Sequence, residues 1–308
     1  MDAPFKLVLR VREKLFALGI LRIHRLSHPV VSIGNLTLGG TGKTPLTILL
    51  AEKLHERGFR PVILSRGYGR TTRGVQVVSR GQGPLQTWQE SGDEPFLMAQ
   101  RLKNVASVVV GESRYLAGRK AESEDLGNLF LLDDGFQHRQ LHRDFDILTI
   151  DPEEWDKGES LLPIGRWREP KSASRRADAA CVQNRTLSDL SVPQFIVRIE
   201  IEEPPIKEWA VKSITAFAGI AKPERFFRTL ESAGVQINRR VPFPDHHVYS
   251  DSDIRQLSGD VRVTTEKDAV KLQGRGEFFA LRVSAQISDY DRFEALMLPR
   301  LLRPKLPS

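Results

Sequence analysis

Residues 37–44, Thr-Leu-Gly-Gly-Thr-Gly-Lys-Thr, have the types and spacing that bind phosphate groups. The common phosphate-binding loop reads G-x-x-x-x-G-K-S/T, and here Thr37 replaces its first glycine. In such a loop Lys43 would reach the β- and γ-phosphates of a nucleotide, and the Thr44 hydroxyl would ligate Mg²⁺. We therefore predict that ATP or GTP is held by Thr37, Leu38, Gly39, Gly40, Thr41, Gly42, Lys43 and Thr44.

Two adjacent acids could hold the metal of this nucleotide. Residues 129–138, Leu-Phe-Leu-Leu-Asp-Asp-Gly-Phe-Gln-His, predict a buried strand ending in Asp133 and Asp134, beside the phosphate loop. The alternative is that the two acids only form a turn with the glycine that follows. The lysine and threonine of the phosphate loop favour the metal role.

Transfer of a phosphoryl group to an alcohol also needs a group that receives the hydroxyl proton. Asp93 is one candidate, although residues 91–94 also fit a capping box at the start of a helix. His246 and His247 are further candidates, because a histidine can orient a carboxylate or share its proton. Spacing alone does not decide between these roles.

Apolar runs rich in Val, Ile and Leu alternate with helix-length segments. Such continuous runs are typical of a parallel sheet covered by helices on both faces. A run at 30–34 precedes the phosphate loop and an amphipathic helix over 44–57 follows it, which points loop N–H groups at an anion. This context disfavours a glycine-rich turn that binds nothing. We expect an α/β fold of the P-loop NTPase type, with strands at 30–34, 61–65, 106–111, 129–133, 146–151, 178–183 and 194–199.

Two segments interrupt this alternation. Residues 151–176 are charged, Pro-rich and too long for a simple connection, so we expect them to be functional or partly mobile. Residues 202–208, with two consecutive prolines, are typical of an extended linker, and a second, shorter α/β series follows them. The predicted organisation is an N-terminal helix within 1–26, a phosphate-loop domain over 27–203 and a smaller α/β domain over 204–308.

The N-terminal segment combines apolar and basic residues. Residues 1–26 contain six Lys/Arg and two acids, so they carry +4 of the net charge of +7. As a helix, the segment would be amphipathic, and its longest uncharged run, Leu15 to Leu21, is far short of the roughly 20 residues that span a bilayer. It could lie on an anionic membrane surface or pack on the protein's own core, and the pattern alone does not decide.

The composition of the 308-residue chain is that of an ordinary globular protein, with 40% hydrophobic and 28% charged residues. The single cysteine, Cys181, allows no internal disulfide, and no Cys/His group has zinc-ligand spacing, so a reducing cytosolic setting fits best. No basic stripe is interleaved with aromatic residues, so we expect no nucleic-acid partner.

Several motifs, taken in their order along residues 30–272, resemble the tetraacyldisaccharide 4′-kinase (lipid A 4′-kinase) family of Gram-negative-type bacteria. These motifs are SIGNLTLGGTGKTP, LSRGYGR, SGDEPFLMA, LLDDGFQH, LLPIGRWREP and FPDHH. The resemblance implies an enzyme dependent on ATP and Mg²⁺ at the cytoplasmic face of the inner membrane. Its substrate would be the 4′-hydroxyl of a tetraacylated glucosamine disaccharide 1-phosphate, and its product lipid IVA.

The resemblance also implies roles for residues in the matching motifs. Asp93 would be the catalytic acid/base, assisted by a histidine of the Asp-His-His segment, for which we take His246 with His247 as the alternative. The metal and phosphates would be served by Asp133 and Asp134, with Glu169 in support. Four residues are implied near the reacting groups or the disaccharide: Asn35, Tyr68, Arg114 and His138.

The main alternative is a membrane-surface P-loop ATPase or GTPase switch that has no lipid substrate. Partitioning ATPases carry a lysine just before the paired glycines, where this chain has Leu38. GTPases normally read guanine with Asn-Lys-x-Asp, and the nearest stretch, Thr-Glu-Lys-Asp at 265–268, has a different order.

Overall fold

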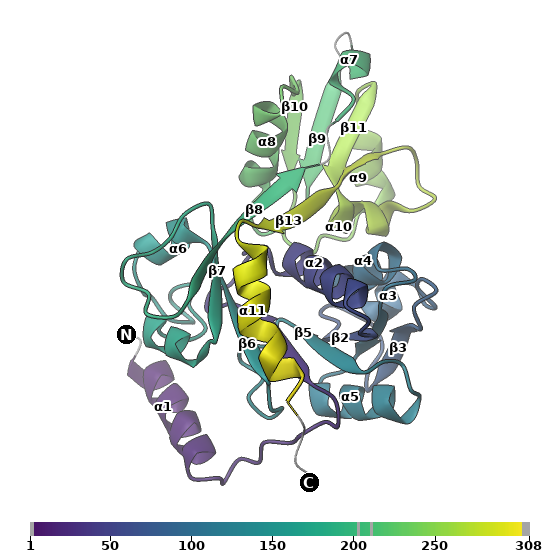
Figure 1. The fold of residues 1–308 in the computed structure, drawn as a ribbon. Coiled ribbons are helices and arrows are strands. Elements are labelled where there is room, and N and C mark those ends of the chain that lie inside the picture. Colours follow the sequence, from purple (N-terminus) through teal and green to yellow (C-terminus); the bar gives the residue numbers. More distant parts are fainter. Residues whose placement is uncertain (1–2, 202–203, 210–211, 304–308) are drawn as a thin grey trace.

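The computed structural model describes residues 3–201, 204–209 and 212–303, which form a nine-stranded and a four-stranded sheet (Figure 1). The large sheet has the order β13-β8-β7-β6-β1-β5-β2-β4-β3, and only β13 and β3, at its edges, run antiparallel to their neighbours. The predicted α/β fold with a parallel sheet is confirmed. Its strands are β1 (Val30–Gly34), β2 (Pro61–Ser65), β3 (Gln76–Ser79), β4 (Ser107–Val110), β5 (Leu129–Asp133), β6 (Phe145–Ile150), β7 (Ala179–Gln183), β8 (Gln194–Ile201) and β13 (Val283–Ile287).

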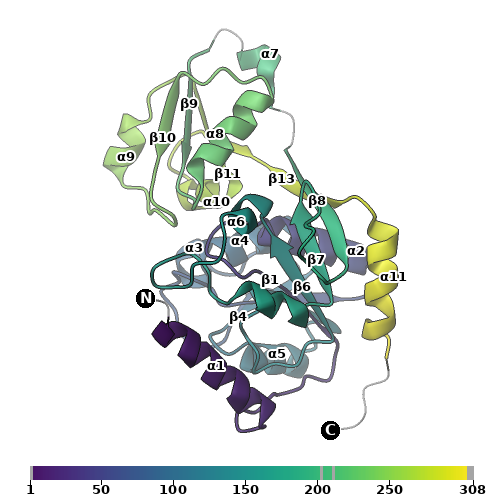
Figure 2. The same ribbon diagram turned by 90° about the vertical axis from the view of Figure 1, so that its left-hand side faces the viewer.

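Helices cover both faces of the large sheet, as its continuous apolar strands require (Figure 2). One face packs against α2 (Lys43–Glu56), α4 (Asp93–Arg101) and α11 (Tyr290–Leu301). The other face packs against α5 (Arg114–Ser123), α6 (Pro152–Asp156) and the 3₁₀ helix η1 (Lys171–Arg176). A short helix, α3 (Trp88–Ser91), directly precedes α4.

The order of the central strands creates a crevice beside β1. From β1 the chain passes through α2 to β2, leaving β5 between them, and after β5 it continues to β6 on the opposite side of β1. Ligands of open α/β sheets bind at such a switch point, at the carboxyl ends of the strands. The phosphate loop follows β1 at this edge.

The small sheet is parallel, in the order β10-β9-β11-β12. The predicted segment 204–308 is divided between the two sheets, because β13 pairs with β8 and α11 packs on the large sheet. Residues 278–285 therefore span parts of two strands that belong to different sheets. The elements of the small sheet are α7 (Ile206–Trp209), β9 (Ile214–Ala218), α8 (Pro223–Ser232), β10 (Arg239–Pro242), α9 (Asp251–Gln256), β11 (Val261–Thr265), α10 (Glu266–Ala269), η2 (Val270–Leu272) and β12 (Phe279–Leu281).

The N-terminal helix α1 (Ala3–Ala17) is shorter than the predicted segment up to residue 26. It ends in a Schellman motif, in which Gly19 adopts φ +70° and the N–H groups of Gly19 and Ile20 donate to the carbonyls of Phe16 and Leu15. Glycine adopts this backbone conformation without a Cβ penalty, so the helix stops here.

The apolar residues of α1 do not all lie on the face that packs against the protein. Phe5 and Leu9 pack against the core beside α6 and η1, and Phe16 is buried. Leu7, Val8 and Val11 are 47–62% exposed. One side of α1 therefore docks on the protein while another presents apolar side chains outward.

Candidate active site

A cavity of about 1500 Å³ lies at the carboxyl edge of the large sheet and reaches the small sheet. The phosphate loop lines it, together with residues at the ends of β2 and β5 and residues 265–267 of the small sheet. The phosphate loop and residues 265–267 are more than 200 residues apart in the sequence. The fold brings most of the candidate residues to this one space.

The phosphate loop is held in shape by its glycines and by hydrogen bonds to the long charged segment over residues 151–176. Gly42 immediately precedes α2 at φ +81°, a conformation that favours glycine. Beside the loop, the Leu38 N–H donates to the Arg166 carbonyl over 2.7 Å, and the Arg168 N–H donates to the Leu36 carbonyl over 2.7 Å. The long charged segment thus packs against the start of the loop.

Asp133 and Asp134 lie next to the phosphate-loop lysine but in different environments. Asp133 is buried and accepts a hydrogen bond from Ser65 Oγ over 3.0 Å. Burial and the nearby carboxylates of Glu94 and Asp134 raise the pKa of Asp133 to about 7. A nearby cation lowers the pKa of such a buried carboxyl, so the carboxyl would ionise when a cation binds.

Asp134 is paired with two cations. Its carboxylate lies 3.4 Å from Lys43 Nζ and accepts a hydrogen bond from the Arg168 guanidinium over 2.7 Å. Burial acts to raise the pKa of Asp134, but Lys43 and Arg168 lower it below the ordinary value. Asp134 is therefore ionised beside the phosphate loop.

Asp93 and His246 meet across the two sheets. Asp93 begins α4 and is buried, and its Oδ2 lies 2.9 Å from Nδ1 of His246 in the loop after β10. Burial acts to raise the pKa of Asp93, but His246 and the cation of Lys267 lower it overall. His246 lines the cavity, with the ring of Tyr68 4.8 Å from its own.

His247 points elsewhere. Its Nε2 lies 3.1 Å from the Asp253 carboxylate, and its ring stacks on Phe243 at 4.6 Å. The structure therefore brings Asp93 together with the first histidine of the pair.

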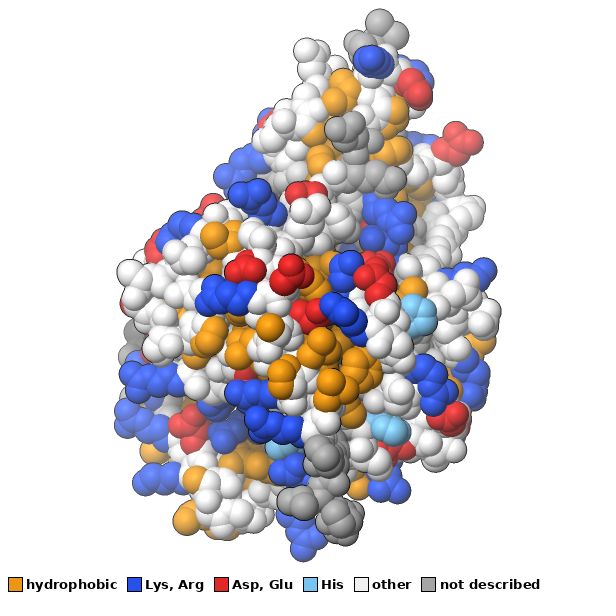
Figure 3. Space-filling model, viewed as in Figure 1, with side chains coloured by type: hydrophobic (Ala, Val, Ile, Leu, Met, Phe, Trp, Pro, Cys, Tyr) orange, Lys and Arg blue, Asp and Glu red, His pale blue; other side chains and the backbone are white. Residues whose placement is uncertain are grey.

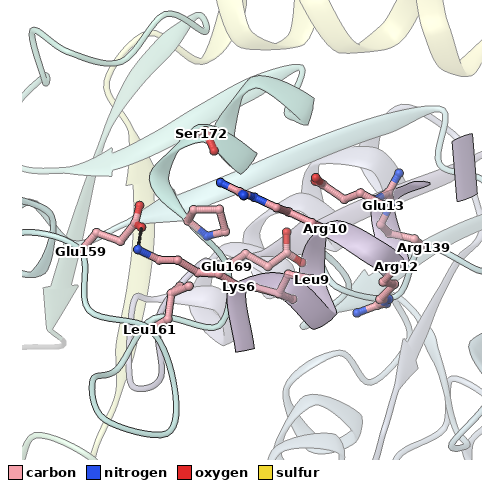
Figure 4. Close-up of a pocket in the computed structure, with 11 residues that line it drawn as sticks. Lys6, Leu9, Arg10, Arg12, Glu13, Arg139, Glu159, Leu161, Glu169 and Ser172 are labelled. Atoms are coloured by element: carbon pink, nitrogen blue, oxygen red, sulfur yellow. Dashed lines mark ion pairs between the residues drawn. The ribbon is translucent and has the colours of Figure 1, made fainter. Parts of the chain in front are cut away.

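Glu169 lines the same cavity as Thr44, Asp133 and Asp134. Its carboxylate accepts a hydrogen bond from Arg176 over 2.5 Å, and it borders a cavity of about 310 Å³ beside α1, with Lys6 and Arg10 (Figure 4). Among the described residues, no three His, Cys, Asp or Glu side chains form a group that could hold a metal by themselves.

The predicted disaccharide contacts lie near the cavity. Tyr68, Arg114 and His138 line it, and Asn35 is buried at the end of β1. Burial, followed by the charge of Arg114, lowers the pKa of His138 to about 4, so its ring is neutral at physiological pH. Asn35 Oδ1, Arg114 Nε and His138 Nε2 have no hydrogen-bond partner among the residues described.

Sequence reasoning missed three side chains of the site: Ser65, Arg168 and Lys267. Ser65 and Arg168 fall inside motifs that the sequence analysis quoted, LSRGYGR and LLPIGRWREP, but nothing in the motifs singles them out. Lys267 lies in the Thr-Glu-Lys-Asp stretch that was compared only with a guanine-reading motif. Lys267 Nζ lies 3.0 Å from Glu94 and 3.3 Å from His246 Nε2.

The chain matches known proteins over nearly its full length. A model of the family described as tetraacyldisaccharide-1-P 4′-kinase matches residues 1–302. Proteins named tetraacyldisaccharide 4′-kinase are 36% identical in Aquifex aeolicus, over 95% of both chains, and 38% identical in Koribacter versatilis, over 94% of both. A crystal structure of the apo form of LpxK from Aquifex aeolicus in complex with ATP is 34% identical, with a TM-score of 0.84 over 97% of this chain and 98% of that one. The chain therefore belongs to the tetraacyldisaccharide 4′-kinase family, as its motifs predict.

Proposed function

We propose that this chain is an ATP-dependent kinase that phosphorylates the 4′-hydroxyl of a tetraacyldisaccharide 1-phosphate to give lipid IVA. The observation that carries the proposal is a single cavity lined by the phosphate loop, by Asp133 and Asp134, and by His246 of the other sheet. Membership of the family supports the same reaction. A membrane-surface ATPase or GTPase switch without a lipid substrate would leave the Asp93–His246 pair without a role.

ATP is the proposed phosphoryl donor, and a related protein's structure contains it. Its phosphates would lie on the loop from Thr37 to Thr44, against the N-terminus of α2, where N–H groups and the helix dipole favour an anion. Lys43, now beside Asp134, would contact the β- and γ-phosphates.

Mg²⁺ fits the donors of this site. It prefers oxygen ligands and is commonly held by one or two carboxylates together with substrate phosphates. Asp134 Oδ1 lies 3.4 Å from Lys43 Nζ, which would contact the phosphates of bound ATP, and the Asp133 carboxyl is poised to ionise. We assign the metal to Thr44, Asp133 and Asp134, with Glu169, which lines the same cavity and is paired with Arg176, in support. Bound Mg²⁺ would neutralise charge on the transferring phosphoryl group.

Asp93 is the proposed acceptor of the hydroxyl proton. The sugar oxygen bonds to the γ-phosphorus while the bond from that phosphorus to the bridging oxygen of ADP breaks, and the hydroxyl proton passes to Asp93. A sugar hydroxyl is a weak acid, so Asp93 must hold the oxygen in line and accept the proton as the new bond forms. Its lowered pKa keeps the carboxylate ionised for this role, with His246 as the coupled partner.

The acceptor disaccharide would contact Asn35, Tyr68, Arg114 and His138. Buried polar atoms are normally hydrogen-bonded, so the unpartnered atoms of Asn35, Arg114 and His138 are ones that hydroxyl and phosphate groups would satisfy.

We also propose that α1 binds the membrane surface in which the acyl chains of the substrate lie. No helix among the described residues is long and apolar enough to cross a membrane. The exposed Leu7, Val8 and Val11 offer an apolar surface, and basic side chains appear beside hydrophobic ones over the region of α1 (Figure 3). An apolar strip flanked by cations suits an anionic lipid surface. Because the reaction uses cytoplasmic ATP, this surface is the cytoplasmic face of the inner membrane.

The kinase proposal is tested by supplying labelled ATP and the tetraacyldisaccharide 1-phosphate in several detergents. We expect label at the 4′ position, and Asp93→Ala should abolish turnover while nucleotide binding is retained. No transfer by the wild-type protein in any detergent would contradict the proposal.

The membrane proposal is tested by sedimentation with anionic vesicles. Combined substitution of Leu7 and Val11 by Ser should weaken vesicle binding and leave turnover of detergent-dispersed substrate intact. Leu116→Ser, which removes an apolar side chain that is 56% exposed on α5, is the control and should bind as the wild type does. Equal vesicle binding by all three proteins would contradict the membrane proposal and leave α1 with a structural role only.

A further inference from the structure

Lys267 is a nearly enclosed cation that reaches from the small sheet to the proposed catalytic pair. It lies on α10, and its side chain is only 16% exposed. The distances from Lys267 Nζ are 3.0 Å to Glu94, 3.3 Å to His246 Nε2, 3.6 Å to Asp245 and 4.0 Å to Asp93 Oδ2. The ammonium group of Lys267 thus lies close to both members of the pair and to two further acids, Glu94 and Asp245.

The surrounding acids keep Lys267 charged. Burial acts to lower the pKa of Lys267, but Glu94, Asp93 and Asp245 raise it above the ordinary value. A charged lysine carries three N–H donors and no acceptor. Every hydrogen bond that Lys267 makes is therefore one in which it donates.

This fixes the proton on the neighbouring imidazole. Because Lys267 can only donate, its 3.3 Å contact with His246 Nε2 is a hydrogen bond only when Nε2 accepts and carries no proton. A neutral imidazole then has its proton on Nδ1, where it donates to Asp93 Oδ2 over 2.9 Å. The opposite tautomer would set a lone pair of Nδ1 against the Asp93 carboxylate.

The neighbours of Lys267 hold its backbone in place. Glu266 forms an ion pair with Arg101 of α4 at 2.8 Å, and Thr265 caps α10 by accepting from the Asp268 N–H over 3.1 Å. Asp268, which is buried, also accepts from the Gly219 N–H over 2.9 Å. The short helix is tied both to α4 and to its own sheet, so the direction of the Lys267 side chain is set by residues outside the catalytic pair.

We propose that Lys267 is a positioning residue for phosphoryl transfer: its ammonium group holds His246 in the Nδ1–H tautomer and so orients the carboxylate that receives the acceptor proton. The effect of Lys267 on phosphoryl transfer rests on the proposed kinase reaction, whereas the tautomer of His246 does not depend on that reaction. Without Lys267, the imidazole can take either tautomer, and Asp93 loses a cation that favours its ionised form.

The tautomer is tested directly by ¹⁵N NMR of histidine-labelled protein without nucleotide, with the His246 signal identified by its loss in His246→Asn. We expect a protonated Nδ1 and an unprotonated Nε2 in the wild type and a mixture in Lys267→Met. A wild-type His246 protonated at Nε2, or an unchanged tautomer in Lys267→Met, would overturn the inference. This readout requires no kinase activity, so it is independent of the proposed function.

The kinetic consequence is tested by the pH dependence of kcat/KM. Lys267→Met should lower kcat more than it raises KM for ATP, and should move the acid limb upward by about 1–3 pH units, the effect of a nearby opposite charge. Lys267→Arg should keep the limb near its wild-type position. The other titratable groups facing the pair are unchanged in these variants: Tyr68, Glu94, Asp245 and Lys271.

Arg101→Met is the matched control for loss of a cation at the same interface. It breaks the ion pair between α4 and α10, whereas the contacts of Lys267 with Asp93 and His246 stay in place. We expect lower stability with an unmoved acid limb. A limb that moves equally in Arg101→Met, or stays in Lys267→Met, would show that Lys267 only holds the two sheets together.

Discussion

Removing the imidazole of His246 should impair catalysis by an amount that its hydrogen bond sets. His246 adopts φ +60°, so His246→Gly deletes the side chain without straining the backbone. The deletion takes away the donor 2.9 Å from the ionised Asp93. Hydrogen bonds to charged groups are worth about 1.5–3 kcal/mol, which corresponds to a fall in kcat of about 10- to 160-fold.

The direction of the pH effect follows from the forces on Asp93. Burial raises its pKa and His246 opposes this, so the deletion should raise the pKa and move the acid limb of kcat to higher pH. His246→Asn should restore part of the activity, because its amide nitrogen is as many bonds from the backbone as Nδ1 and tolerates positive φ. The assay is transfer of labelled phosphate at saturating ATP across a pH series.

His247→Ala is the matched control for this deletion. His247 stacks on Phe243 and pairs with Asp253, away from Asp93. Its loss should lower stability by about 1 kcal/mol and leave kcat and the acid limb unchanged. Undiminished turnover in His246→Gly, or a loss confined to His247→Ala, would refute the assignment of the functional histidine.

Two further predictions concern the phosphate and metal side of the cavity. The raised pKa of Asp133, about 7, means that the folded protein binds this proton more tightly than the unfolded chain, so stability without Mg²⁺ should fall as pH rises from the usual carboxyl range to 7. Melting curves should show that fall in the wild type and lose it in Asp133→Asn; an identical pH dependence in both would contradict the assignment. Gly42→Ala should cost about 1–2 kcal/mol of strain, since φ is +81° and the new Cβ would lie 3.2 Å from Ile199 and from Gln183. Nucleotide titration should then show weaker binding, and wild-type affinity would contradict it.

The phosphate loop and its flanking elements could be predicted because their signals are local. The strand at 30–34 has the predicted bounds, and the helix expected over 44–57 forms as α2. A continuous apolar run and a glycine cluster specify these elements without information from distant parts of the chain. The end of the N-terminal helix is also set by a local signal. Gly19 ends the helix, although the amphipathic pattern of the sequence continues past this residue.

The choice between Arg168 and Glu169 could not be predicted from their motif. Residues 166–168 pair with residues 36–38 in an extended conformation, where successive side chains point to opposite sides. Arg168 thereby faces Asp134, whereas Glu169 faces Arg176. The motif locates the segment, but only its pairing with residues 36–38 decides which of the two side chains contacts Asp134.

The catalytic pair depends on contacts that no local pattern carries, because its two halves belong to different sheets. Asp93 starts a helix on the large sheet, while His246 and Lys267 follow strands of the small one. The adjacent strands β8 and β13 carry the chain away from the large sheet and back to it, and the Arg101–Glu266 ion pair ties α4 to α10. The placement of the small sheet therefore sets the distance between the acid that accepts a proton and the groups that orient it. A lone lysine in Thr-Glu-Lys-Asp has no signature of its own, and its role follows only from the three acids and one imidazole that surround it.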